Sequence, residues 1–254
     1  MILVADNIQA MNPRVSDAIK QMDPEPIREI ALAAERAGAK ILDINPGYLS
    51  RRHEDRIVFL IETVQEVTDL RLMIDSANPD VLVKGAGVCR QKPILNALSL
   101  EPHKLDTLLP LAAEVQTDLV LLLMDDDAMS PPRTDEKIAI ALELRERCLA
   151  AGIDESLLIY DPVLPTLRGP DAFFHVGQCV QTIRLLSSGV VLGDAVRTMI
   201  GLSNLRSGQR KLYPDRLDEI CLSMMGGAGL SLALADALNE KTVAALRIVN
   251  QLSS

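Results

Sequence analysis

Short apolar runs recur along the chain, and they keep ending on an aspartate or an asparagine. The polar ends of seven such runs are Asp6, Asn45, Asp75, Asn96, Asp125, Asp161 and Asn204. Helix-length amphipathic stretches lie between them. One such residue is ordinary turn chemistry, because Asp and Asn bond to nearby backbone amides and start helices. Seven in the same place predict a repeated unit of strand, polar end and helix.

The pattern places eight strands and the helices between them. The expected strands cover residues 2–6, 40–45, 70–75, 93–96, 118–124, 157–160, 196–201 and 230–233, of which the eighth has the weakest pattern. The first expected helix starts at Asp23 and Pro24 and is closed by Gly38, and another starts at Asn78 and Pro79 by the same device. The remaining helices are expected over residues 52–67, 104–115, 134–151, 171–186, 215–225 and 240–252.

This alternation predicts an α/β fold, a (β/α)8 TIM barrel, as a single domain over residues 1–254. Strands that alternate with helices pair in parallel through right-handed crossovers. A doubly wound open sheet is the main alternative, but it would carry a glycine-rich first crossover, and residues 6–14 contain no glycine. In a barrel the carboxyl ends of the strands share one face, which is where such enzymes keep their active sites.

Composition narrows the class of partner. Hydrophobic residues make up 48% of the chain but aromatic residues only 2%, so the core must be aliphatic, as buried parallel strands usually are. The net charge of -9 argues against nucleic acid and anionic lipid as partners, because both reward clustered Lys and Arg. The first residues do not resemble a signal peptide, and no segment approaches the ~20 apolar residues of a membrane helix. We therefore expect a cytoplasmic protein.

The residue types at the strand ends limit the chemistry. The four cysteines are far apart without a CxxC pair, and the three histidines lie in unrelated contexts, so we expect no bound metal. Lys, His and Cys are absent from the strand ends, which disfavours Schiff-base, metal-hydroxide and thiolate mechanisms. Carboxylates and carboxamides can instead bind the N–H and carbonyl edge of a polar heterocycle such as guanine or a pterin.

Five segments at barrel spacing resemble one family. They are LDINPG, IDSANP, ILNALSLE, IYDPVLP and GLSN, beginning at Leu42, Ile74, Ile94, Ile159 and Gly201. Together they resemble the pterin-binding methyltransferases, barrels that move a methyl group between methyltetrahydrofolate and the cobalt of a corrinoid (cobalamin) carried by a separate protein. Members serve the corrinoid iron–sulfur protein and bacterial O-demethylase systems in one-carbon metabolism. The resemblance runs from the first strand to the last helix.

The resemblance implies roles for particular residues. Asp75, Asn96 and Asp161 would hold the pyrimidine edge of the pterin, and Asn204 would lie beside N5 as the catalytic residue. It also implies tetrahydrofolate as a small-molecule substrate, a corrinoid protein as partner, and a homodimer. Further candidates for substrate binding are Asp43, Asn45, Ser203 and Gly201, although Asp43 could equally cap a loop.

Two segments of the expected active face depart from corrinoid iron–sulfur relatives. One is the end of the first strand, with Asp6 and Asn7, and the other is the acidic run that begins at Asp125. The partner, the contacts to the folate tail or the direction of transfer could differ accordingly. Arg206 and Arg210 could meet the folate carboxylates or the partner, or be solvated loop residues.

Three alternatives remain open at this point. A dihydropteroate synthase-like enzyme would share the pterin pocket, but it needs basic residues for its leaving phosphate, and GLSNLRSG lacks the Ser-Arg-Lys signature of that enzyme. A sugar-phosphate barrel would want a glycine-rich phosphate loop near strands seven and eight. A non-catalytic folate-binding subunit would bind folate without turnover.

Overall fold

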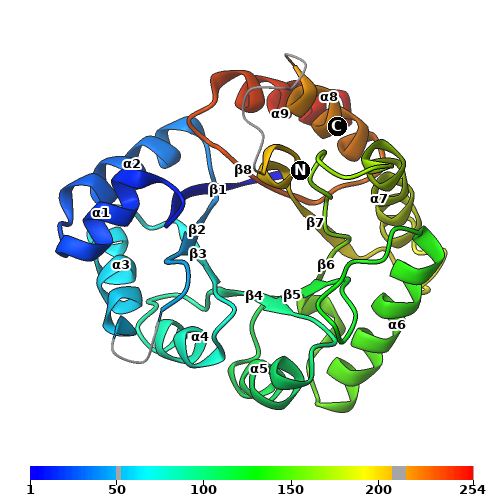
Figure 1. The fold of residues 1–254 in the computed structure, drawn as a ribbon, viewed down its shortest axis with the longest axis horizontal. Coiled ribbons are helices and arrows are strands. Elements are labelled where there is room, and N and C mark those ends of the chain that lie inside the picture. The colour runs from blue at the N-terminus through cyan, green and yellow to red at the C-terminus, as the bar shows by residue number, and fades with distance from the viewer. Residues whose placement is uncertain (50–52, 208–215, 254) are drawn as a thin grey trace.

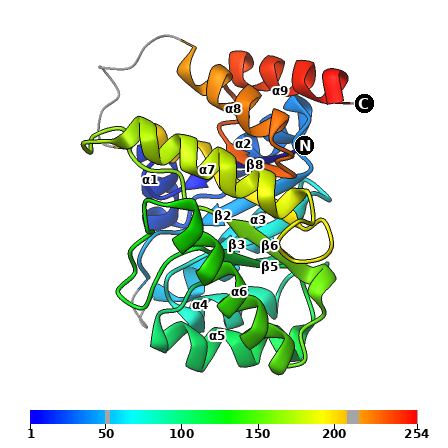
Figure 2. The same cartoon turned by 90° about the vertical axis from the view of Figure 1, so that its right-hand side faces the viewer.

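The strands form a closed barrel. The structure, a computed structural model, describes residues 1–49, 53–207 and 216–253. Among these residues, eight parallel strands pair in chain order, and the eighth closes the ring against the first. Figure 1 shows the helices arranged around this ring, and Figure 2 shows the same arrangement from the side. The predicted single-domain (β/α)8 TIM barrel is therefore confirmed.

All eight strands lie close to their predicted places. They are β1 Ile2–Gln9, β2 Ile41–Asn45, β3 Arg71–Asp75, β4 Ile94–Leu98, β5 Leu119–Leu122, β6 Leu158–Asp161, β7 Arg197–Gly201 and β8 Leu232–Ala235. Two boundaries differ in ways that affect the site. β1 continues past Asp6 to Gln9, because its register against β2 shifts between Ala5 and Ile8. β8 was predicted over residues 230–233 and lies two residues later.

The described helices cover the outside of the barrel. They are α1 Pro13–Gln21, α2 Glu25–Ala37, α3 Asp55–Gln65, α4 Pro79–Ala86, α5 Pro102–Val115, α6 Thr134–Ala150, α7 Ala172–Ser187, α8 Leu217–Gly227 and α9 Glu240–Ser253. The predicted starts of two helices, at residues 52 and 215, lie outside the described residues. The helix α1 was not predicted, although Asn12 caps it and Pro13 occupies its first turn. The same Asn-Pro device was recognised at α4.

Aliphatic side chains fill both sides of the barrel wall. One cluster occupies the inside of the barrel and comes from every strand: Val4, Ile41, Met73, Ile94, Ala97, Val120, Ile159, Met199 and Leu232. A larger cluster packs the outer faces of the strands against the helices. Full burial of one such aliphatic side chain stabilises a fold by about 1.5–3 kcal/mol. The inner cluster also fills the barrel's middle, which separates its two ends.

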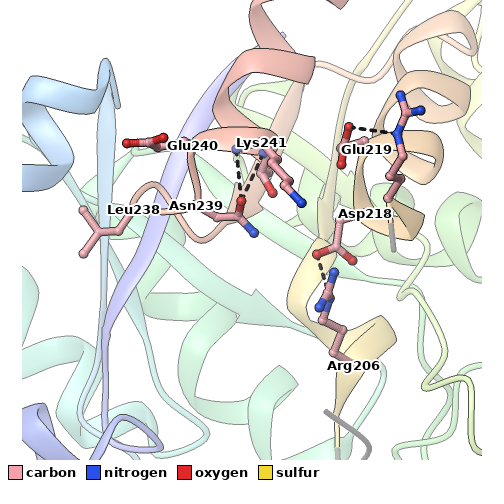
Figure 3. Close-up of a pocket in the computed structure, with 9 residues that line it drawn as sticks. Arg206, Asp218, Glu219, Leu238, Asn239, Glu240 and Lys241 are labelled. Carbon is pink, nitrogen blue, oxygen red and sulfur yellow. Dashed lines mark hydrogen bonds and ion pairs between the residues drawn. The ribbon is translucent and has the colours of Figure 1, made fainter. Parts of the chain in front are cut away.

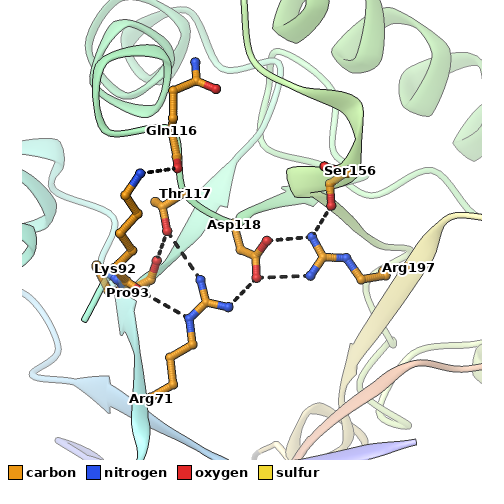
Figure 4. Close-up of polar contacts among 8 residues, drawn as sticks. All are labelled: Arg71, Lys92, Pro93, Gln116, Thr117, Asp118, Ser156 and Arg197. Atoms are coloured by element: carbon orange, nitrogen blue, oxygen red, sulfur yellow. Dashed lines mark hydrogen bonds and ion pairs between the residues drawn. The ribbon is translucent and has the colours of Figure 1, made fainter.

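An ionic network closes the amino-terminal end of the strands (Figure 4). Asp118, just before β5, lies between Arg71 of β3 and Arg197 of β7. Arg197 donates to both carboxylate oxygens, at 3.0 and 2.6 Å, and to the carbonyl of Ser156 at 2.6 Å. Burial alone would raise the pKa of Asp118, but hydrogen bonds and charges from Arg197 and Arg71 outweigh it and hold that pKa below its usual value. Both oxygens of this carboxylate thus accept hydrogen bonds from arginine side chains of the protein.

Three further sequence expectations can be compared with the fold. Cys148, Cys179 and Cys221 are buried and Cys89 is half-buried, all as free thiols, as the sequence indicated. In the part of the chain that the structure describes, no helix has both the length and the apolar character that crossing a membrane requires. Among the same residues, no three His, Cys, Asp or Glu side chains gather in a group able to hold a metal ion.

Candidate active site

A cavity of about 930 Å³ opens at the carboxyl end of the barrel. Each of the eight strands contributes a residue to its wall. Of the twelve candidate site residues that the structure describes, eleven line it: Asp6, Asn7, Asp43, Asn45, Asp75, Asn96, Asp161, Gly201, Ser203, Asn204 and Arg206. The ring of strand-end residues is therefore a physical cluster, brought together because parallel strands end on one face.

Asp125 uses its carboxylate differently. β5 ends at Leu122, so Asp125 falls in the loop beyond the barrel's edge. One carboxylate oxygen accepts the backbone N–H groups of Asp127, at 3.1 Å, and Met129, at 2.8 Å. This is the turn-forming use of aspartate. Asp125 therefore stabilises its own loop. It is not among the described residues that line the cavity.

Asp75 is oriented by its neighbour on β2. The Asn45 side-chain amide donates to Asp75 Oδ2 at 2.9 Å, while the Asn45 Oδ1 accepts the backbone N–H of Gly47 at 3.0 Å. Gly47 has φ +69°, and a Cβ there would lie 2.9 Å from the Cβ of Ala10, so the turn of the LDINPG segment requires glycine. Burial raises the pKa of Asp75 to about 6, although the Asn45 hydrogen bond and the charge of Lys104 lower it.

Asp161 ends β6 and is held by the turn that follows it. Its Oδ1 accepts the backbone N–H of Val163 at 2.7 Å, and Val163 has a left-handed φ of +59°. Burial raises the pKa of Asp161 to about 7, with a further rise from the charge of Asp75. The Val163 N–H and the charge of Lys137 act in the opposite direction. This carboxylate therefore changes its charge near neutral pH.

Asp43 and Asp6 each carry a buried oxygen that has no partner among the described residues. Burial, followed by the charges of Asp75 and Asp6, raises the pKa of Asp43 well above its usual value. Burial also raises the pKa of Asp6 to about 6, opposed by a hydrogen bond from Ser203. An unsatisfied buried oxygen is costly, on the order of 1–3 kcal/mol. Such groups in a cavity indicate a ligand that supplies the missing hydrogen bonds.

Asn204 faces the cavity from a short 3-10 segment, η3 Leu202–Arg206, directly after β7. Its side-chain amide makes no hydrogen bond with the described residues. A Cβ on Gly201 would lie 3.3 Å from its Nδ2, so the absence of a side chain at 201 leaves room for the amide. Among the described residues, no group therefore competes with a ligand for the hydrogen bonds of the Asn204 amide.

The described cations of the cavity wall are already paired. Lys104 of α5 forms an ion pair with Glu101 at 2.6 Å, and Arg206 forms one with Asp218 at 2.7 Å. The described part of the wall contains neither Cys nor His. The cavity is therefore suited to accept N–H groups from a neutral or cationic polar ring, and its described residues offer no unpaired cation for a phosphate group.

The sequence did not indicate three charged residues of the wall, Asp236, Asp218 and Lys104. Asp236 follows β8 and accepts from the Asn7 amide at 2.6 Å, while the Asn7 Oδ1 accepts the backbone N–H of Ala237 at 3.0 Å. The strand-end pattern would have found Asp236 if β8 had been placed correctly. Asp218 and Lys104 come from helices, and a pattern of strand ends cannot detect them.

A second cavity of about 450 Å³ adjoins the first one. Figure 3 shows its wall, in which Arg206 points toward Asp218, and Asn239 and Lys241 lie at the start of α9. Arg206 and Asp218 belong to the walls of both cavities, so their ion pair lies at the boundary. Arg210, the other arginine considered from the sequence, lies outside the described residues.

The fold and the site together define a barrel with a polar cavity at the strand carboxyl ends. A family model described as pterin binding enzyme matches residues 11–237. The chain therefore belongs to the pterin-binding enzyme family. The predicted membership is confirmed.

Individual relatives share low identity over nearly the whole chain. The methylcorrinoid:tetrahydrofolate methyltransferase of Eubacterium limosum is 25% identical over 250 residues, which cover 97% of this chain and 89% of that protein. The methionine synthase of Mycobacterium leprae is 24% identical over 249 residues, or 93% of this chain and 20% of that protein.

Solved structures of dihydropteroate synthases share the fold. The enzyme from Yersinia pestis with a pterine–sulfa conjugate has a TM-score of 0.70 at 19% identity, covering 99% of this chain and 92% of that one. The enzyme from Xanthomonas albilineans with 4-aminobenzoic acid has a TM-score of 0.72 at 20% identity, covering 100% and 92%. At this identity the similarity shows a common barrel.

Proposed function

We propose that this protein transfers a methyl group between N5 of tetrahydrofolate and the cobalt of a corrinoid carried by a partner protein. The proposal is based on the residue types that line the cavity of this pterin-binding chain. Its free groups are carboxylates and carboxamides, and its described residues include no thiol or imidazole to take up the methyl. The methyl acceptor must then come from outside. Similarity to a methylcorrinoid:tetrahydrofolate methyltransferase over 97% of the chain supports the same reaction.

In this proposal the pterin ring lies against Asp75, Asn96 and Asp161. Ionised carboxylates accept the N–H groups of the pyrimidine edge, and a carboxamide can serve an adjacent carbonyl and N–H together. Asn45 keeps Asp75 in position through its hydrogen bond, and the N–H of Val163 does the same for Asp161. Asp43 and Asp6 offer further acceptors deeper in the cavity, and Ser203 and Gly201 border it beside Asn204.

Asn204 is the residue that we assign to the reaction itself. When the methyl carbon leaves N5, its bonding electrons remain on N5, which must take up a proton. The Asn204 amide oxygen can accept a hydrogen bond from the developing N5–H. Stabilisation that exists only in the transition state raises turnover, and one such group is typically worth about 10² in rate.

The methyl acceptor or donor would approach through the open mouth. Four loop or loop-adjacent side chains after β1, β2, β5 and β6 expose large apolar surface: Met11, Tyr48, Met129 and Phe173, which are 73%, 89%, 64% and 71% exposed. Met11 also lines the cavity, and exposed apolar side chains beside a site are typical of a docking surface. We therefore propose that the corrinoid protein docks over these four exposed side chains. Homodimerisation remains a prediction, as does the setting in an O-demethylase system.

The dihydropteroate synthase-like alternative is less well supported. That reaction releases pyrophosphate, which calls for free cations, yet the two cations among the described wall residues, Lys104 and Arg206, are each paired with a carboxylate. A dihydropteroate synthase-like protein would form dihydropteroate from a pterin pyrophosphate and an aminobenzoate. A non-catalytic folate-binding subunit would bind methyltetrahydrofolate without converting it.

One experiment separates these functions. The purified protein is mixed with methyltetrahydrofolate and a corrinoid reduced to Co(I), free or protein-bound, and the visible spectrum is followed for methyl-cobalt. The reverse reaction starts from methyl-Co(III) and tetrahydrofolate. The proposal expects a protein-dependent spectral change in at least one direction. Tight folate binding with no spectral change in either direction would favour the non-catalytic subunit.

A further inference from the structure

A buried lysine stands behind the wall of the cavity. Lys137 of α6 is only 2% exposed, and it is not among the residues described as lining the cavity. Its ammonium group donates to the Ser130 hydroxyl at 2.5 Å and to the carbonyl of Pro162 at 2.6 Å. Pro162 follows Asp161 directly, so Lys137 holds the turn that carries a proposed pterin-binding carboxylate.

The partners of Lys137 do not neutralise its charge. Both of its hydrogen-bond acceptors are neutral, and no ion pair involving it is found among the described residues. A buried ammonium without a paired anion is costly, so lysines are rarely fully buried unless they are paired. The titratable groups that face it are the Asp161 carboxylate of β6, the Glu136 carboxylate of its own helix, and the uncharged Cys179 thiol of α7. Of these, Asp161 belongs to the cavity.

The geometry connects Lys137 to Asp161 through three consecutive residues. The Asp161 carboxylate accepts the N–H of Val163, and the carbonyl between these two residues belongs to Pro162. Cys179 also contacts this carbonyl, with its sulfur 3.7 Å away. The turn is therefore fixed from the cavity side by Asp161 and from the outer side by Lys137.

We propose that Lys137 is a positioning residue that clamps this turn and favours the ionised form of the Asp161 carboxylate, which accepts ligand N–H groups. The role of Asp161 toward a pterin rests on the proposed function. The charge effect does not, because it belongs to the ligand-free protein. The charge of Lys137 lowers the pKa of Asp161, whereas that of Asp75 raises it. Loss of the Lys137 cation therefore leaves burial and Asp75 unopposed by any charge.

The direct test follows the Asp161 carboxyl by ¹³C NMR across a pH titration of the ligand-free protein. In Lys137→Met, which keeps the length of the side chain without its charge, the titration midpoint should rise by on the order of 1 pH unit. Lys137→Arg keeps the charge, and its midpoint should stay close to that of the wild type. Cys179→Ala removes an uncharged contact to the same carbonyl and should leave the midpoint unchanged.

A further variant and a second readout keep the proposal testable. Ser130→Ala removes one acceptor of the Lys137 ammonium at a half-buried loop position. The Asp161 midpoint should rise in this variant, by less than the shift expected for Lys137→Met. This variant provides the test if Lys137→Met does not fold. In binding experiments, Lys137→Met should weaken methyltetrahydrofolate binding on the order of tenfold at pH 6 and recover wild-type affinity at high pH.

The outcomes distinguish this inference from the proposed function. An unchanged Asp161 midpoint in Lys137→Met, or in Ser130→Ala if that protein alone folds, would overturn the inference. An affinity loss of equal size at every pH would also overturn it, because a purely structural role predicts that result. If the wild type binds no methyltetrahydrofolate, the proposed function fails, while the NMR titration still decides the role of Lys137.

Discussion

At the amino-terminal end of the barrel Asp118 lies between two arginines, whereas at the carboxyl end Asp6, Asp43 and Asp161 crowd into a cavity with few cations. Arg71 and Arg197 satisfy Asp118 and hold its pKa below the usual value. Burial raises the pKa of the cavity carboxylates instead. Aspartate thus stabilises the amino-terminal end of the barrel, whereas the buried aspartates at the carboxyl end lower the stability of the fold when they are ionised.

This difference indicates where the barrel keeps its function. A carboxylate whose two oxygens are both paired with arginines inside the protein has little capacity left for a ligand, as at Asp118. A buried carboxylate with an unpartnered oxygen, as at Asp43, is destabilising until something binds. Barrels of this type generally separate stability and activity between their two ends. The predictions below test that separation.

The largest effect is expected for Asn204→Ala. Loss of the amide should lower the rate of methyl transfer on the order of 10²-fold, because the hydrogen bond to N5–H forms only as the methyl leaves. Folate affinity and the free energy of unfolding should change little, since the amide makes no hydrogen bond to the described residues. Single-turnover spectroscopy and equilibrium binding measure the two properties separately. A parallel loss of affinity and rate would show that Asn204 binds the ground state.

At the opposite end, Asp118→Ala should lower the free energy of unfolding by about 2 kcal/mol, because both arginines lose their anion while remaining about one third exposed to water. Denaturant unfolding measures this loss. The rate of transfer per folded molecule should equal that of the wild type. A slower reaction in the folded variant would mean that the two ends are coupled.

A stabilising substitution is expected within the cavity. Asp161→Asn should raise the free energy of unfolding at pH 7.5 on the order of 1 kcal/mol, since the desolvated charge is removed and the Val163 N–H keeps an acceptor. Thermal and denaturant unfolding in the absence of ligand provide the measurement. A loss of stability at this pH would contradict the view that Asp161 is retained for ligand binding.

The two ends should respond to pH with opposite sign. Burial raises the pKa of Asp43 in the folded protein, so its contribution to stability is present at acid pH and is lost as the pH rises through the folded value. The folded pKa of Asp118 is lowered, so its contribution is present above the unfolded pKa and is lost as the pH falls through the folded value.

Matched amide variants test these signs. The advantage of Asp43→Asn over the wild type should grow from pH 4 to pH 8, and the deficit of Asp118→Asn should shrink as the pH falls toward 3. Both changes are expected to be on the order of 1 kcal/mol. Slopes of the same sign for the two variants would refute the contrast between the ends.

The sequence pattern was sufficient to predict the barrel and most of the polar strand-end residues that line the cavity. Asp75, Asp161 and Asn96 follow or end apolar runs, and the closure of parallel strands places such residues together. The pattern did not predict strand boundaries that depend on the pairing register between neighbouring strands. The shift between Ala5 and Ile8 extends β1 past Asp6 because of its pairing with β2, which a single run does not reveal.

Other features depend on contacts between distant segments. Lys137 reads as an ordinary helix residue in the sequence, and only the packing of α6 behind β6 places its ammonium on the Pro162 carbonyl. Asp118 appears as the start of an apolar run, whereas its two arginines are 47 and 79 residues away. Asp125 ended an apolar run but lies beyond the last paired residue of β5. The pairing of β5 with its neighbouring strands ends at Leu122, so Asp125 lies in the loop that follows.

The most direct test of the account is equilibrium binding of methyltetrahydrofolate at pH 8 to Asp161→Asn and Asp118→Asn. The two variants carry the same substitution at opposite ends of the barrel. We expect Asp161→Asn to lose at least about tenfold in affinity, because a hydrogen bond to a charged acceptor contributes about 1.5–3 kcal/mol. Asp118→Asn should bind as the wild type does. Equal affinities for both variants, or a larger loss in Asp118→Asn, would contradict the assignment of the cavity carboxylates to pterin binding.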